Sequence, residues 1–255
     1  MNLWHHKDHA GPVTAAQVGH SRYGTPLGEI IHADLHYDKR KWMIIPTGWA
    51  ESGGRWSGPQ EWADTMADLL WGAWAEESPD AVRPGPEAVE RTALEFRSFG
   101  ERFGGFDPQR PFEIVTYVYL PDPNRYAMPV HVWVDDRPEL TVEAATEDPD
   151  ASEPPKPEDF ATDALGVGRK VTTHGVLDPQ PGDLPGTRPM WVTVRYAFAV
   201  PGRQAVVTVK ATETDLARMS AAADDLDEFV RTITLSLADN TPVVIGSTTE
   251  PAAES

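Results

Sequence analysis

The first regular pattern in the chain is an alternation of apolar and polar side chains that starts near residue 29. In EIIHADLHYD, every second residue from Ile31 to Tyr37 is apolar, and the residues between them are polar. A period of two is typical of a strand with one buried face. The polar DKRK that follows predicts a turn, and WMIIP predicts a returning strand that Pro46 ends. We therefore expect a β-hairpin over residues 29–46.

Two helices are predicted next. In SGPQEWADTMADLLWGAW, apolar residues recur three or four positions apart and form one helical stripe. Ser57 is the expected N-cap, and Gln60 completes a capping box three residues later. In EAVERTALEFRSFGERFGG, a second stripe runs through Phe96 and Phe103, and two glycines end the helix. The first stripe comprises Trp62, Met66, Leu69, Leu70, Ala73 and Trp74.

Most of the remaining chain predicts strands. Runs rich in β-branched and aromatic residues recur, and the clearest two are joined by a Pro-Gly turn at 201–202. The acidic, proline-rich segment 147–159 predicts a linker or an exposed loop. Residues 220–235 predict a closing helix with a stripe through Leu226, Phe229, Val230 and Ile233. The expected strands are 112–120, 129–134, 139–144, 169–176, 189–200 and 204–214.

This order of elements predicts an α+β fold with a largely antiparallel sheet flanked by helices, because strands and helices do not alternate as βαβ units. Residues 1–28 show no periodicity, so we expect a flexible N-terminal arm. We expect a single domain over 29–237 and a disordered tail over 238–255.

The final third of the chain resembles a known family. MWVTVRYAFAVPGRQAVVTVKATETDL, followed by DDLDEFVRTITL, is similar to the end of Mog1/PsbP-like domains. The earlier WMIIPTGW resembles an opening segment of such domains. The resemblance implies a long hairpin leading to a helix that packs back on an antiparallel sheet. It also implies an accessory, partner-binding role, and it transfers no catalytic residue.

The charge and composition of the chain exclude some classes of ligand and chemistry. The 255 residues carry a formal net charge of −18, which argues against nucleic acid and anionic membranes and favours a partner with a basic surface. Without cysteine, thiol catalysis and disulfides are excluded. No apolar run has the length of a membrane span, and no secretory signal is recognisable, so we expect a cytoplasmic protein. Arginine outnumbers lysine, and Ala, Gly and Pro are abundant, which is typical of actinobacterial-type genomes.

Six of the nine tryptophans lie between residues 42 and 74. Trp42, Trp62 and Trp74 fall on apolar faces and are expected in the core. Trp49 and Trp56 lie in the loop GWAESGGRWSG, and Trp71 lies off the centre of the helical stripe. We interpret most of these rings as packing residues. Those that remain accessible are our candidates for partner binding, which are Trp49, Arg55, Trp56 and Trp71.

Histidine and acidic residues offer a second kind of site. His32, Asp34 and His36 share one face of the first predicted strand, but a strand places His32 and His36 ~13 Å apart, too far for one zinc ion. Distant histidines, His131 or His174, would have to complete such a site. His5 and His9 have helical ligand spacing in a segment without a helix signal. We recognise no nucleophile elbow or P-loop, and the adjacent Asp135 and Asp136 suggest a turn.

We expect a non-enzymatic accessory or adaptor protein, associated with secretion or assembly, that binds another protein without a cofactor or metal. One alternative is a metal-dependent hydrolase that uses His32, Asp34 or His36 with distant histidines. Another is a structural subunit of a phage or injection particle.

Overall fold

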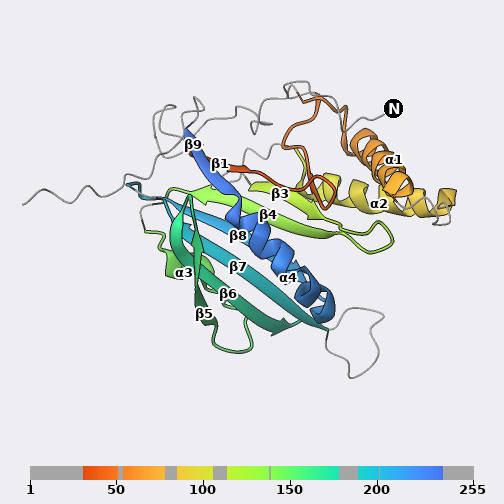
Figure 1. The fold of residues 1–255 in the computed structure, drawn as a ribbon. Helices are drawn as coiled ribbons and strands as arrows, with labels where there is room; N and C mark the ends of the chain where they lie inside the picture. Colours follow the sequence, from red (N-terminus) through yellow and green to blue (C-terminus); the bar gives the residue numbers. More distant parts are fainter. Residues whose placement is uncertain are drawn as a thin grey trace, which may run out of the picture.

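The computed structural model describes residues 31–50, 54–77, 85–105, 114–137, 139–177, 189–200 and 202–237. The expected arm and tail, with His5 and His9, lie outside them. The described elements, shown in Figure 1, are β1 (Ile31–Leu35), β2 (Trp42–Ile44), α1 (Pro59–Glu77), α2 (Pro86–Phe103), β3 (Ile114–Tyr119), β4 (Met128–Asp135), α3 (Val142–Thr146), β5 (Lys156–Thr162), β6 (Gly166–Val176), β7 (Met190–Ala199), β8 (Val206–Glu213), α4 (Leu216–Arg231) and β9 (Ile233–Leu237).

Seven strands form one antiparallel sheet in the order β2-β3-β4-β8-β7-β6-β5. The fold is therefore α+β with a largely antiparallel sheet, as the sequence predicts. Its centre is the predicted hairpin of β7 and β8, in register from Ala199 and Val206 to Val192 and Glu213. Gly202 lies in the connecting turn with φ +70°, a conformation that glycine adopts without steric cost.

The predicted hairpin over residues 29–46 is wrong. Strand β1 pairs with β9 in a separate two-stranded sheet, whereas β2 pairs with β3. The turn between β1 and β2 does form, because the Lys41 N–H donates to the Asp38 carbonyl at 2.9 Å. Alternation identifies a strand and its buried face, but it does not identify the strand's partner. Here the partner is the C-terminal strand β9, which begins within the predicted closing helix over residues 220–235.

Three further predictions need correction. Residues 142–146 form helix α3 rather than a strand, and the Thr141 side chain caps it by accepting from the Ala144 N–H. The last residues of the acidic segment 147–159 are not a loop, because strand β5 begins at Lys156. This strand lies at the edge of the sheet, where proline and charged residues are tolerated. The closing helix spans Leu216–Arg231, and Ile233 lies in β9.

The predicted start of the first helix is also wrong in detail. Helix α1 begins at Pro59, and the Ser57 N–H and hydroxyl both donate to the carboxylate of Glu61. The Gln60 amide instead donates to Asp64 on the next turn. Glu61 therefore accepts both bonds from Ser57, in place of the reciprocal pair of a capping box, because its carboxylate is the stronger acceptor.

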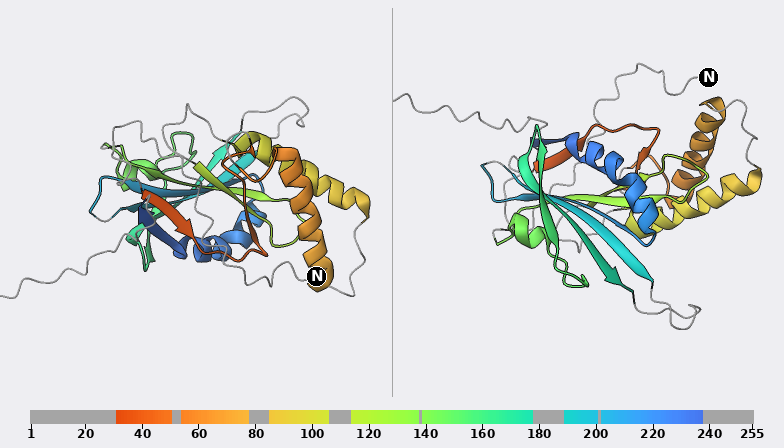
Figure 2. Two further views of the ribbon diagram at one scale, coloured as in Figure 1. Left: turned by 90° about the horizontal axis from the view of Figure 1, so that it is seen from above. Right: turned by 60° about the horizontal axis from the view of Figure 1, so that its bottom comes forward.

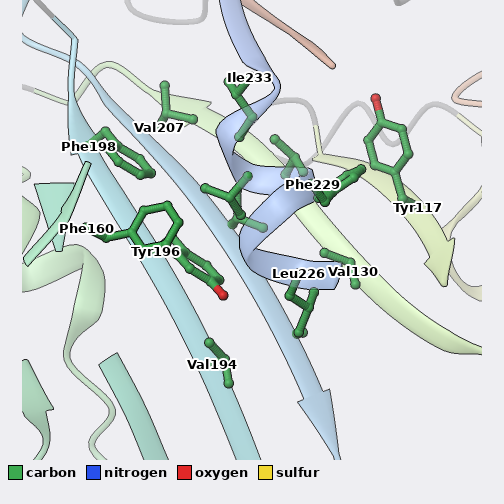
Figure 3. Close-up of a cluster of buried hydrophobic side chains, with 14 of the residues drawn as sticks. Tyr117, Val130, Phe160, Val194, Tyr196, Phe198, Val207, Leu226, Phe229 and Ile233 are labelled. Carbon is green, nitrogen blue, oxygen red and sulfur yellow. The ribbon is translucent and has the colours of Figure 1, made fainter. Parts of the chain in front are cut away.

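Helices cover the sheet from different directions. Helix α4 runs diagonally across one face (Figure 1), and α1 and α2 pack on each other at the β2–β3 end (Figure 2). The main core lies between α4 and the sheet, where Phe229 stacks on Trp42 with ring centroids 4.0 Å apart. Figure 3 labels Tyr117, Val130, Phe160, Val194, Tyr196, Phe198, Val207, Leu226, Phe229 and Ile233 in this core.

Candidate functional site

A groove of about 220 Å³ lies between α4 and strands β6 and β7. Its floor consists of three cross-strand pairs, each with a polar residue on β6 and an apolar or aromatic residue on β7. These pairs are His174 with Val192, Thr172 with Val194, and Lys170 with Tyr196. Its wall is the helix stripe Leu216, Met219, Ser220, Ala223 and Leu226. The sheet extends past the edge of α4, which leaves this space only partly covered.

One end of the groove is closed by a polar cluster. The carboxylate of Asp227 accepts from Lys170 Nζ at 2.7 Å and from the Tyr196 hydroxyl at 2.6 Å. Burial raises the pKa of Tyr196 above its usual range, and the hydrogen bond to Asp227 raises it further. Tyr196 therefore remains a neutral donor that fixes helix and sheet together, which does not suit a catalytic base.

The other end opens onto exposed apolar side chains. Leu216 is 43% exposed at the start of α4, and the cross-strand pair Met190 and Val176 is 44% and 42% exposed. The same two turns of α4 expose Ala217, Ser220 and Ala221. This uncharged surface continues out of the groove, and we call Val176, Met190 and Leu216 the groove mouth.

Acidic residues border this apolar region. Asp224 and Glu228 are exposed on the second half of α4. Asp215 caps the first turn by accepting from the N–H groups of Ala217 and Arg218. An apolar centre with a charged border is the usual anatomy of a protein–protein interface.

The Trp49–Trp56 loop is less open than its sequence suggests. Trp49 and Trp56 are half-buried against the α1–α2 cluster. A Cβ atom added to Gly104 would lie 2.4 Å from Trp49 Cζ2, so the indole lies directly on the end of α2. Arg55 is exposed, with its guanidinium 4.8 Å from the centroid of the Trp56 ring. The loop therefore presents one exposed cation beside two half-buried indole rings.

The expectation of an accessible Trp71 is wrong. Its side chain is buried, and its indole N–H donates to Thr92 Oγ1 at 3.1 Å between α1 and α2. Trp74, which was expected in the core, is only half-buried against the Trp71 ring. The helical stripe is rotated toward Trp71 because α2 covers α1 from that side. Trp42 and Trp62 are buried as expected.

The described side chains are not arranged as the hydrolase hypothesis requires. Within the described ranges, no three His, Cys, Asp or Glu side chains gather closely enough to hold a metal ion. Asp34 accepts from Ser236 Oγ at 2.5 Å, and His36 is exposed. His174 faces the groove, whereas His131 contacts Thr116 and Phe103 on the opposite face of the sheet. The side chain of His32 lies outside the description.

Comparisons with protein-family models, with curated proteins and with solved structures found no match. Among the helices that the structure describes, none is long and apolar enough to cross a membrane. The groove is not evident from any single segment of the sequence. The available signal was the polar alternation Lys170, Thr172, His174 beside the apolar alternation of β7, which indicates a sheet face that is only partly covered.

Proposed function

We propose that this chain is a non-enzymatic accessory protein that binds another protein through the groove beside α4. The observation that carries the proposal is the continuity between the groove and the exposed groove mouth. The three apolar side chains of the groove mouth are 42–44% exposed. A partner that covers them would remove this apolar area from water, and such burial is the main source of binding free energy. The resemblance to Mog1/PsbP-like domains supports the same class of function.

The partner we propose presents a bulky apolar side chain flanked by lysine or arginine. The apolar side chain fits the groove, whose wall contains Met219 and Leu226. The basic flank suits the exposed Asp224 and Glu228 on the same helix and the net charge of −18. Charges at the border of an interface mainly accelerate association and select the partner. Arg55 and the half-buried rings of Trp49 and Trp56 are proposed as a separate, smaller contact.

Photo-crosslinking in the native cell, followed by affinity measurement, tests this proposal. A photoreactive residue at position 216 should capture a defined partner, whereas one at position 167 should not. Val167 is a matched control because it is apolar and 69% exposed, yet it does not line the groove. With the purified partner, Leu216→Ser combined with Met190→Ser should weaken binding at least tenfold, while Val167→Ser should leave it unchanged.

Three results would contradict the proposal. The first is equal affinity of the groove-mouth variant and wild type for a partner that is captured elsewhere on the chain. The second is a loss of binding on Arg55→Ala alone, which would move the main contact to the Trp49–Trp56 loop. The third is large homomeric assembly in light scattering, which would favour a structural subunit.

A further inference from the structure

The sheet face away from α4 carries a row of basic side chains across its central strands. His131 on β4 is in register with Lys210 on β8, and Lys210 is in register with Arg195 on β7. Directly opposed residues in antiparallel strands have Cβ atoms about 4.5–5.5 Å apart, and like charges in this position are destabilising. We call Lys210, Arg195 and the neighbouring Thr212 the Lys210 strip. It lies on the opposite face from the groove and does not depend on the proposed function.

Among the described residues, Asp148 forms a direct ion pair with only one of these cations. Asp148 accepts from Arg195 Nη1 at 2.6 Å, and both side chains are nearly buried, with 7% and 11% exposed. Lys210 Nζ forms no hydrogen bond or ion pair with any residue that the structure describes. Burial lowers the pKa of Lys210, and Arg195 lowers it further, against the smaller opposing effects of Asp148 and Asp150. A half-buried lysine with no direct ion pair to a described residue is unusual in a chain with 40 acidic and 22 basic residues.

The strip has an exposed end at Thr212. Thr212 follows Lys210 on the same face of β8 and is exposed, and its hydroxyl lies 2.8 Å from that of Thr193. Lysine, threonine and the remaining N–H groups of arginine are all hydrogen-bond donors. An anion with at least three acceptor oxygens can accept from three such side chains at once, whereas a carboxylate has two oxygens.

We propose that the Lys210 strip binds the phosphate group of a small molecule, with Lys210 as the counter-charge, Thr212 as a neutral donor and Arg195 as a second cation. The binding free energy would then compensate for the cost of keeping Lys210 half-buried beside Arg195.

Thermal unfolding with inorganic phosphate tests this proposal, with potassium chloride at matched ionic strength as the reference. Phosphate should raise the melting temperature of wild type by about 3 °C at ten times the dissociation constant, and the shift should then grow with the logarithm of the phosphate concentration. Lys210→Met should abolish this shift, whereas Lys156→Met, at an exposed edge-strand position, should retain it. Without phosphate, Lys210→Met should melt at the same temperature as wild type or higher, because it removes a half-buried cation that lies beside Arg195 and has no direct ion pair to a described residue.

The proposal is overturned by a phosphate shift that persists in Lys210→Met, or by wild type that gains nothing over potassium chloride. Equal stabilisation by acetate at the same ionic strength would assign the strip to carboxylates instead. A lower melting temperature of Lys210→Met in phosphate-free buffer would show that Lys210 stabilises the fold, and it would equally overturn the proposal.

Discussion

Helix α4 is attached to the sheet by two matched clusters, and the first supports a quantitative prediction. Asp225 accepts from the Tyr119 hydroxyl at 2.5 Å and from Lys41 Nζ at 2.7 Å, both on the β2–β3 side. Asp227, two residues later, makes the equivalent contacts with Tyr196 and Lys170 on the β6–β7 side. We predict that Asp225→Asn destabilises the protein because the amide cannot replace the charge of the carboxylate.

The magnitude follows from the two contacts. A hydrogen bond to a charged group contributes about 1.5–3 kcal/mol and a neutral one about 1, so the Tyr119 contact loses about 1 kcal/mol. The Lys41–Asp225 ion pair is 36% and 22% exposed, and such pairs contribute about 0.2–1 kcal/mol. The expected loss is therefore about 1.5 kcal/mol, or about 3–6 °C in melting temperature for a chain of this size.

The pH dependence has a definite sign. Burial alone would raise the pKa of Asp225, but the hydrogen bonds from Lys41 and Tyr119 outweigh it and hold that pKa below its usual value. A lowered pKa in the folded state stabilises the protein above the unfolded value of about 3.9, and this stabilisation disappears as the pH falls through the folded value. The difference between wild type and Asp225→Asn should be constant from about pH 5 to 8 and should close below about pH 4.

Urea unfolding at several pH values measures this difference, with Asp224→Asn as the control. Asp224 is exposed on the same helix, so its substitution removes the same charge without a contact to the sheet. Tyr119→Phe, alone and combined with Asp225→Asn, isolates the pairwise interaction. The reasoning is refuted if Asp225→Asn costs no more than Asp224→Asn, or if its cost is unchanged at pH 3.

Three further predictions concern packing. Gly104→Ala should destabilise by more than about 1 kcal/mol and change tryptophan fluorescence, because its Cβ would lie 2.4 Å from Trp49 Cζ2. Gly72→Ala should instead stabilise by about 0.5–1 kcal/mol in the same assay, since nothing lies within 4 Å of an added Cβ on this helix. Phe229→Ala should cost about 3–5 kcal/mol in urea unfolding, because it empties the buried space beside Trp42; a cost below 1 kcal/mol would contradict this packing.

The sequence predicts elements well where one physical signal dominates. The β7–β8 hairpin has two continuous apolar runs and a Pro-Gly turn, and α2 has a clear stripe through Phe96. Prediction fails where two signals compete. In residues 139–144, Val142 lies between polar residues, which resembles the alternation of a strand. The segment nevertheless starts a helix, because the Thr141 side chain caps its first turn. Residues 156–159 are charged and contain proline, which predicts a loop. They form an edge strand instead, because they pair with β6.

The candidate sites were harder to predict because each depends on contacts between distant segments. The periodicity of α1 predicts an apolar stripe, but the position of α2 determines that Trp71 rather than Trp74 is buried. The groove needs β6, β7 and α4 together, and the Lys210 strip needs the register of β4, β8 and β7. Local alternation predicts which face of a sheet a residue occupies. Its cross-strand neighbours depend on the strand order, which local alternation does not predict.

The attachment of α4 also bears on how the groove would bind. The helix is held to the sheet near its start by the ion pair between Arg218 and Glu213 of β8, and in its second half by Asp225 and Asp227. The wall of the groove lies between these two sets of contacts, so its distance from β6 and β7 is fixed before a partner arrives. Binding to such a preformed site loses little conformational entropy, and affinity then depends on how well one apolar side chain fits the space. Under the proposed function, the contacts that stabilise the fold would also favour selective recognition of a partner.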